Sequence, residues 1–213
     1  KKIDWKKREE ELLRLLDIHR GRYGKYDCIV PGSGGKDSAY AAHILKFKYG
    51  MSPLTVTWSP VLYTDYGYNN FKNWIKSGDF KNISAKRNEK LLKILTKLSI
   101  ENLLHPFQNF ILGQKAFPPK IALKYKIPLV FYGENEAEHH NAIADNRKRL
   151  RDKSFHIFKN LSELRFGGLK ISEICSEYNF KVKDFEPFLP IYSDKLKNFP
   201  LEVHYLGYYL KWI

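Results

Sequence analysis

The fold of this chain is decided by residues 26–38, which read Tyr26-Asp27-Cys28-Ile29-Val30-Pro31-Gly32-Ser33-Gly34-Gly35-Lys36-Asp37-Ser38. The short run up to Val30 predicts a buried strand, and residues 38–49 predict a helix that Gly50 ends. Glycines lie between the two, where the backbone must turn sharply. We therefore expect a strand, a tight turn and a helix in direct succession.

This turn has the chemistry of an anion-binding site. Glycines bring backbone N–H groups close to a ligand, and the following helix adds the positive end of its dipole. Ser33 and Ser38 add hydroxyl donors, and Lys36 adds a full charge. A phosphate or pyrophosphate group fits here, and a glycine turn without a ligand is the alternative interpretation.

The rest of the chain alternates helices with strands. Periodic apolar residues predict helices at residues 4–20, 66–77, 89–104 and 119–126. Apolar runs beside Pro or Gly predict strands at residues 54–58 and 128–132. After residue 140 the pattern weakens to a loop-rich stretch at 141–168, a short helix at 171–178 and a strand at 201–206. Such alternation indicates an α/β protein with a parallel sheet.

Composition excludes several classes of protein. The 213 residues are 43% hydrophobic and 15% aromatic, which is enough to bury a core and argues against wholesale disorder. No apolar run approaches about 18 residues, and the start of the sequence lacks the apolar stretch of a signal peptide. Cys28 and Cys175 form neither a disulfide framework nor a zinc site. We expect a cytoplasmic protein without a membrane span.

The net charge of +14 raises the prospect of an anionic partner. Nucleic acid, a membrane surface and a phosphorylated substrate all remain open. The densest basic patch is Arg147-Lys148-Arg149-Leu150-Arg151, and the other basic residues are spread along the chain. Because solvated surface lysines explain the same charge, it carries little weight.

The turn matches one nucleotide-binding pattern. The Walker A pattern fails, because Asp37 follows Lys36 where Ser or Thr is required, and the dinucleotide fingerprint also fails at Asp37. The stretch Ser33-Gly34-Gly35-Lys36-Asp37-Ser38 instead resembles the PP-loop of the ATP pyrophosphatase superfamily. This resemblance implies a Rossmann-like fold of the HUP, or adenine nucleotide alpha-hydrolase-like, type. It also implies that the loop holds the phosphate end of ATP, with Mg²⁺ as a cofactor.

Further stretches narrow the resemblance to the N-acetyl sugar amidotransferases of surface-glycan pathways, such as O-antigen and pseudaminic or legionaminic acid synthesis. The matching stretches are Tyr63-Thr64-Asp65, Glu101 to Gln108, Gly113-Gln114-Lys115, Gly133-Glu134-Asn135-Glu136 and His204 to Tyr209. The resemblance covers nearly the whole chain. It implies residues 25–140 as the ATP-binding domain, preceded by a helix at 1–24, with 141–213 as a further part of the same domain.

The resemblance also implies a reaction. The amide oxygen of an acetamido group attacks the α-phosphorus of ATP, pyrophosphate leaves, and ammonia then displaces AMP to give an acetamidino group. The substrate would be a nucleotide-linked or sialic-acid-like (nonulosonic acid) sugar. Ammonia would come from a separate glutaminase subunit similar to that of imidazole glycerol phosphate synthase. Relatives are often dimers, so a homodimer is expected.

Candidate site residues follow from the same comparison, each with a structural alternative. Lys36 would neutralise phosphate charge, and Asp37 would hold Mg²⁺ or cap the helix. Glu134 and Glu136 would bind Mg²⁺ or sugar, or be exposed loop acids, and Asp65 would bind ATP or cap the next helix. The nucleotide contacts expected are Ser33, Gly34, Gly35, Lys36, Asp37, Ser38, Asp65 and Gly133. The substrate contacts expected are Asn135, His105, Gln108 and Lys115, with Lys120 another lysine for the phosphates.

The chain also departs from the family. Relatives carry paired cysteines, a zinc site, ahead of the first helix, and no such cysteines occur here. Zinc is therefore expected only in a segment preceding Lys1, and the natural protein is expected to be longer at both ends. Cys28 and Cys175 are interpreted as core thiols and not as glutaminase nucleophiles.

Two rival functions remain open. A tRNA-modifying PP-loop enzyme, of the lysidine synthetase or tRNA thiolation type, would explain the positive charge. A module that keeps the nucleotide fold as an interaction surface would bind ATP without releasing pyrophosphate. Binding of tRNA that weakens with salt would favour the first of these rivals.

Overall fold

A five-stranded sheet forms the centre of the computed structural model, which describes residues 3–135 and 147–211. The strands lie in the order β3-β2-β1-β4-β9, and every neighbouring pair is parallel. Their bounds are Cys28–Pro31 (β1), Pro53–Thr57 (β2), Asn82–Ser84 (β3), Leu129–Tyr132 (β4) and Glu202–Tyr205 (β9). Ile29 of β1 lies opposite both Leu54 and Val130. The strand order therefore reverses between β1 and β4.

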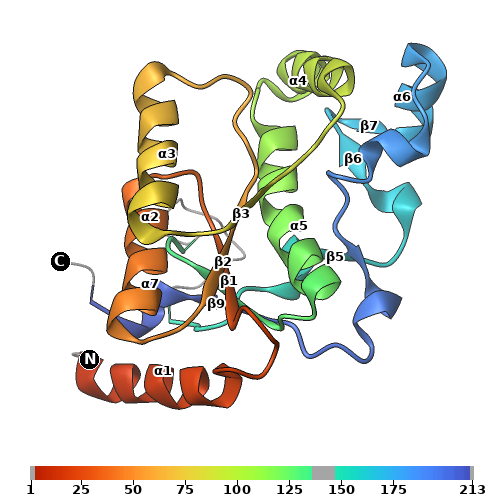
Figure 1. Cartoon of the computed structure of the whole chain (residues 1–213). Coiled ribbons are helices and arrows are strands. Elements are labelled where there is room, and N and C mark those ends of the chain that lie inside the picture. Colours follow the sequence, from red (N-terminus) through yellow and green to blue (C-terminus); the bar gives the residue numbers. More distant parts are fainter. Residues whose placement is uncertain (1–2, 136–146, 212–213) are drawn as a thin grey trace.

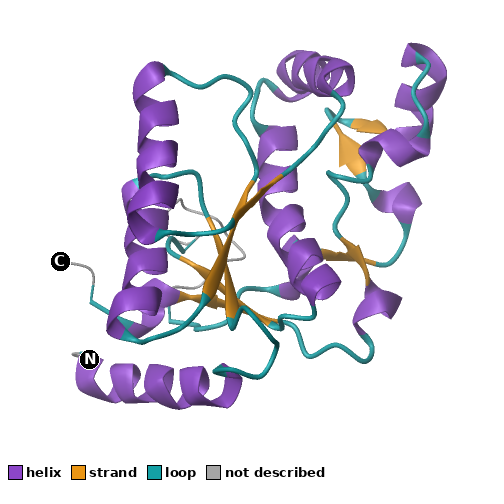
Figure 2. Ribbon diagram, in the orientation of Figure 1, coloured by secondary structure: helices purple, strands orange, loops and turns teal. Residues whose placement is uncertain are grey.

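Helices cover both faces of this sheet (Figures 1 and 2). On one face lie α1 (Trp5–His19), α2 (Lys36–His43), α3 (Asp65–Gly78) and α7 (Leu206–Tyr209). On the other face lies α5 (Gln108–Tyr125), with α4 (Glu89–Leu103) packed against it. The predicted α/β class, with a parallel Rossmann-like sheet, is confirmed.

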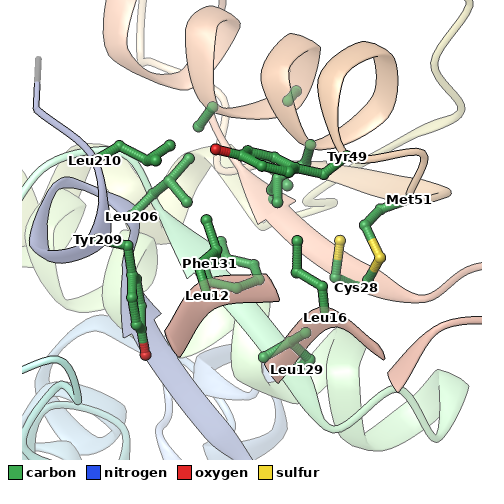
Figure 3. Close-up of a cluster of buried hydrophobic side chains, with 14 of the residues drawn as sticks. Leu12, Leu16, Cys28, Tyr49, Met51, Leu129, Phe131, Leu206, Tyr209 and Leu210 are labelled. Atoms are coloured by element: carbon green, nitrogen blue, oxygen red, sulfur yellow. The ribbon is translucent and has the colours of Figure 1, made fainter. Parts of the chain in front are cut away.

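The first core lies under α1, α2 and α7 (Figure 3). Leu12 and Leu16 project from α1 toward Phe131 of the sheet, and none of the three side chains is exposed. Cys28 is equally buried, and burial raises the pKa of its thiol. Its interpretation as a core thiol fits this position, because a thiolate nucleophile needs the opposite shift.

The second core joins the other face of the sheet to α5. Val56 and Val130 pack there with Ala122 of α5. A third cluster lies further out, where Phe166 and Phe185 pack against α4. Short elements run along the outer side of α5 (Figure 1): η3 (Lys153–Phe155), β5 (Ile157–Phe158), η4 (Leu161–Glu163), β6 (Arg165–Phe166), β7 (Leu169–Lys170), α6 (Ile171–Tyr178), η5 (Val182–Phe185), β8 (Ile191–Tyr192) and η6 (Ser193–Leu196). Of these, η4, β6, β7, α6 and η5 contribute residues to the third cluster.

Helix α5 corrects the predicted helix at 119–126, because it begins eleven residues earlier, at Gln108. Pro118 and Pro119, which lie at the start of the predicted range, lie inside the observed helix. Proline lacks the N–H that would bond to the carbonyl four residues earlier. Other side chains replace these bonds: the Tyr132 hydroxyl donates to the Gln114 carbonyl at 3.2 Å, and Arg151 donates to the Lys115 carbonyl at 3.4 Å. Tertiary donors thus let the helix continue through both prolines.

Smaller differences between the predicted and the observed elements concern the ends of helices and two short elements. Helix α2 begins at Lys36, two residues early, and continues as a π-helical turn, η1 (Ile44–Lys48). Helix α3 runs to Gly78, one residue past the predicted end at 77, and Asp79 follows as the left-handed cap with φ of 44°. Strand β3 and helix α7 were not predicted, because three polar-flanked residues and a single helical turn leave no periodic signal.

None of the helices in the described ranges combines the length and the apolar character needed to cross a membrane.

Candidate active site

The glycine-rich turn between β1 and α2 is shaped by close contact with α3. Gly34 has φ of +88°, and a Cβ atom there would lie 2.6 Å from the Cα atom of Phe71. At Gly32 an added Cβ would lie 2.8 Å from the ring of Trp74. A Cβ at Gly35, in contrast, would meet no protein atom within 4 Å. The turn therefore packs its back against α3 and leaves the Gly35 side open, where a ligand can approach the backbone.

The first helical residues place two opposite charges beside the turn. Lys36 donates to both carboxylate oxygens of Asp37, at 3.0 and 2.7 Å. This ion pair, followed by a hydrogen bond with the Glu134 side chain, holds the pKa of Asp37 below its usual range. The Lys36 side chain is 89% exposed and that of Asp37 is 24% exposed. Lys36 can therefore swing onto an arriving phosphate, while Asp37 stays beside Glu134 as a charged carboxylate.

Glycine at position 133 brings the end of β4 against the start of α2. A Cβ atom there would lie 2.7 Å from the Asp37 carbonyl oxygen. The next residue, Glu134, is thereby held next to Asp37, although 97 residues separate the two in sequence. The pair spans the point where the strand order reverses, which is where open parallel sheets bind ligands.

A cleft of about 170 Å³ opens at this point. The turn supplies Gly32, Ser33, Gly35 and Ser38 to its lining, and the end of β4 supplies Tyr132, Gly133 and Glu134. Trp58, Phe110 and Gln114 form further parts of the wall. A second cavity of about 300 Å³ shares Ser33, Gly35 and Phe110 with the first, and Tyr63, Thr64 and Asn70 line it on the β2 side. The turn thus lies between two spaces that both reach its backbone.

Arg87 holds the wall of both spaces in place, and no sequence pattern pointed to this residue. Its guanidinium donates to the backbone carbonyls of Ser59 and of Pro60, the latter at 2.9 Å. It also lies over the Trp58 ring, 5.3 Å from the ring centre. The side chain is only 4% exposed. Arg87 therefore clamps the segment after β2, whose Trp58 lines one space and whose Pro60 lines the other.

The structure brings many predicted site residues together. Ser33, Gly35, Ser38, Gly133 and Glu134 line the cleft, and Gly34 lines the neighbouring cavity. Lys36 and Asp37 flank them as described above. Asn135 follows Glu134 and is buried, outside the lining of both spaces. Glu136 lies outside the described residues.

Other predicted residues lie outside the linings of these two spaces. Asp65 is the first residue of α3, and the expected capping role belongs instead to Thr64, whose hydroxyl accepts from the Gly67 N–H at 3.1 Å. Gln108 bonds to the β6–β7 hairpin, donating to the Arg165 carbonyl at 3.2 Å. His105 accepts from the Phe107 N–H at 3.2 Å. For Gln108 and His105, the alternative to substrate contact is a hydrogen bond that stabilises the fold, and the contacts of both residues are of this kind.

The two lysines expected near the phosphates also lie elsewhere. The Lys115 ammonium lies 4.0 Å from the centre of the Phe155 ring. Lys120 lies one turn further along α5 and lines a separate cavity. Helix periodicity explains this placement, because the face of α5 that reaches the cleft carries Phe110, Gln114 and Pro118 at intervals of four.

The carboxylate pair fits a Mg²⁺ ion that is also bound by phosphates. Mg²⁺ in nucleotide sites takes one or two carboxylates and completes its shell with phosphate oxygens and water. Asp37 and Glu134 supply such a pair. Within residues 3–135 and 147–211, no group of three or more His, Cys, Asp or Glu side chains is placed to hold a metal ion by itself. The donor set therefore suits a metal that arrives with a nucleotide.

Comparisons with known proteins give a likeness of fold only. No protein-family model and no curated protein sequence matches the chain. The chain is similar to the NH3-dependent NAD synthetase of Campylobacter jejuni subsp. jejuni NCTC 11168, with 16% identity and a TM-score of 0.49, over 66% of this chain and 62% of that one. It is also similar to the NMN synthetase of Francisella tularensis, with 16% identity and a TM-score of 0.48, over 68% and 63%. The chain thus spans less than two thirds of the length of either protein.

Proposed function

We propose that this chain is an ATP-dependent amidotransferase that converts an acetamido group of a nucleotide-linked or sialic-acid-like sugar into an acetamidino group. The observation that carries the ATP-dependent part is the glycine-rich turn at the strand-order reversal, faced by the carboxylate pair of Asp37 and Glu134. The sugar and its place in surface-glycan synthesis rest on the sequence stretches that resemble the N-acetyl sugar amidotransferases.

The two spaces on either side of the turn suggest where each reactant binds. The larger cavity on the β2 side, with Tyr63 and Phe110, offers aromatic surface to the adenine ring. The triphosphate then lies over the backbone N–H groups of the turn, with Lys36 neutralising its charge. The cleft on the β4 side, lined by Gln114 and Tyr132, is left for the acetamido group. Bound Mg²⁺ supplies charge neutralisation at the phosphates.

The chemistry needs positioning and charge stabilisation more than a general base. The acetamido oxygen attacks the α-phosphorus, the bond to the β-phosphate oxygen breaks, and pyrophosphate leaves while the amide nitrogen loses its proton. Ammonia then attacks the O-adenylated carbon, AMP leaves, and a second proton is lost. We propose that a glutaminase partner supplies the ammonia, since both cysteines of this chain have thiol pKa values raised mainly by burial.

The test is pyrophosphate release by the natural full-length protein with ATP, Mg²⁺, ammonium chloride and a panel of N-acetyl sugars. We expect release that depends on one sugar and a product in which NH replaces O, measured by mass spectrometry. Lys36→Met and Asp37→Asn should abolish most of this release, whereas the exposed Lys93→Met on α4 serves as the control. Pyrophosphate release that does not depend on any of the sugars would contradict the proposal.

A PP-loop tRNA-modifying enzyme is the second candidate, and the net charge of +14 favours it. In the same assay, bulk tRNA replaces the sugars. Release of pyrophosphate that requires tRNA, together with tRNA binding that weakens steeply as salt rises, would support this candidate over the sugar reaction.

A further inference from the structure

A separate cavity of about 420 Å³ lies on the outer side of α5, and the proposed reaction makes no use of it. It shares no lining residue with the two spaces at the glycine-rich turn. Helix α5 runs past both regions, since Pro118 lines the cleft and Lys120 and Lys124 line this cavity. Its volume lies in the range of about 300–1,000 Å³ that is usual for small-molecule sites.

The cavity is apolar at its floor. Ile121, Leu189 and Ile191 line it, and each of these side chains is at most 7% exposed. One wall is the small parallel sheet of β5 and β8, in which Phe158 lies opposite Tyr192. Their rings meet edge to face, with centres 5.4 Å apart. Regular elements therefore hold both the floor and an aromatic wall in place.

Positive charge gathers at the rim of the same cavity. Lys86, Lys124 and Lys195 line it and are exposed, so their ammonium groups can reach a ligand at the mouth. Glu186 is the only acidic residue in the described lining. At neutral pH the lining lysines outnumber this carboxylate, so an anionic group is favoured there.

Lys120 is the most enclosed of the lining lysines, with a side chain 18% exposed. Its ammonium donates to the backbone carbonyl of Glu186, and the Glu186 carboxylate lies 3.9 Å away. Burial, together with the nearby charge of Lys195, lowers the pKa of Lys120 to about 8, although the Glu186 carboxylate acts in the opposite direction. A bound anion would add a further opposite charge beside this enclosed ammonium and would favour its charged form.

We propose that this cavity is a second ligand site, which binds a small phosphorylated ring compound with its phosphate among the lysines and its ring against Phe158 and Tyr192. A phosphate monoester carries a charge of about −1.5 to −2 at pH 7, which matches the excess of ammonium groups. The aromatic wall and apolar floor add a surface for a ring, which inorganic phosphate alone would leave unused. This proposal does not depend on the proposed amidotransferase activity.

The test uses pyridoxal 5′-phosphate, a phosphorylated aromatic ring whose aldehyde forms an imine with a lysine amine and releases water. Borohydride then reduces the imine to a stable amine, and peptide mass spectrometry locates it. We expect the first label at Lys120, because its lowered pKa leaves more neutral amine at pH 7.5 than an exposed lysine has. Pyridoxal lacks the phosphate and therefore cannot form the charged hydrogen bonds with the lysines. Because such bonds contribute strongly to binding, pyridoxal should label Lys120 at least about tenfold less.

Variants and competitors distinguish the outcomes. Lys195→Met should reduce the Lys120 label several-fold, and the matched change at an exposed lysine outside the cavity, Lys93→Met, should leave it unchanged. Thermal unfolding curves check that both variants fold. Added ATP should protect Lys36 from labelling and should leave the label at Lys120 unchanged. A chain that does not bind ATP would fail only the first of these two results, so the two sites are tested independently. Equal labelling by pyridoxal, or a label spread evenly over exposed lysines, would overturn the proposal.

Discussion

Two adjacent glycines in the turn have different tasks, and substitution separates them. Gly34 adopts φ of +88° and touches the backbone of α3, whereas the space beside Gly35 is empty of protein atoms. Gly34→Ala should therefore destabilise the fold by about 1–3 kcal/mol, since a non-glycine residue is strained there and its Cβ has no room. Urea denaturation measures this change.

Gly35→Ala should cost much less stability, about 1 kcal/mol or below, because alanine is merely a poorer helix cap than glycine. Its methyl group would instead project toward the ligand side of the turn. We expect ATP affinity to fall at least about tenfold, measured by calorimetric titration. A variant that binds ATP normally would show that the nucleotide does not approach the backbone at Gly35.

The carboxylates of Asp37 and Glu134 predict how the reaction depends on metal. Asp37→Asn and Glu134→Gln should each raise the Mg²⁺ concentration needed for half-maximal pyrophosphate release by about tenfold, because each removes one charged ligand. The unfolding free energy of Asp37→Asn should change by less than about 1 kcal/mol, because the Lys36 side chain of its ion pair is exposed. Asp17→Asn, which alters the exposed ion pair of Asp17 with Arg20 on α1, is the control. Unchanged Mg²⁺ dependence in both site variants would argue against the metal site.

At this scale the sequence predicted the turn well and its surroundings poorly. Residues 33–38 are contiguous, and their glycine and serine pattern predicts a tight turn between a strand and a helix. Trp58, Gln114 and Tyr132 reach the cleft from three separate parts of the chain, so no local pattern shows that they lie together. Arg87 was missed for the same reason, since its carbonyl acceptors lie 27 and 28 residues away.

At the scale of elements, α5 depends on a bond from outside itself. Pro118 leaves the Gln114 carbonyl without its helical donor, and the Tyr132 hydroxyl supplies one. Tyr132→Phe should therefore destabilise the protein by about 1 kcal/mol. In a Pro118→Ala background the cost should shrink, because the restored N–H of residue 118 can donate to the same carbonyl. A double-mutant cycle in urea measures the coupling. Additive effects would show that the hydroxyl does not serve this carbonyl.

This dependence explains why the first half of α5 escaped prediction. A Pro-Pro pair is normally found at a helix start, and residues 108–117 have no strong apolar period. The donors that allow the helix, Tyr132 and Arg151, belong to β4 and to a segment some 30 residues later. By contrast, α4 was predicted within a residue, because Leu91, Leu92, Leu95 and Leu98 all face its core.

At the scale of the whole molecule, the sequence predicted the central sheet. It did not predict the outer layer, which is the set of short elements from η3 to η6 along the outer side of α5. Alternating strands and helices indicate a parallel sheet, and its order places β4 beside β1 so that Glu134 meets Asp37. The elements from η3 to η6 are mostly two to four residues long, and packing on α4 and α5 holds them in place. Their cavity, with Lys120, could not be read from local sequence.

The outer layer should also be the part most sensitive to acid. His156 precedes β5, is 2% exposed, and its backbone carbonyl accepts from the Ile191 N–H of β8 at 2.8 Å. Burial, followed by the nearby charge of Arg151, lowers its pKa to about 3. The folded protein therefore keeps His156 neutral, whereas the unfolded chain takes up a proton below about pH 6.5. This difference favours unfolding as the pH falls.

We expect His156 to lower the unfolding free energy by about 1.4 kcal/mol for each pH unit below 6.5, until the pH reaches its folded pKa. His156→Gln, which cannot be protonated, should remove this slope while leaving the stability at pH 8 within about 2 kcal/mol of the parent. Urea denaturation between pH 8 and pH 4.5 measures both. Because His156 joins β5 to β8, hydrogen exchange at pH 5 should accelerate first in these two strands and only later in β1 and β4. Parallel stability curves for parent and variant would mean that His156 takes up its proton without opening the fold, and the wall of the lysine-rich cavity would then survive acid as well as the central sheet does.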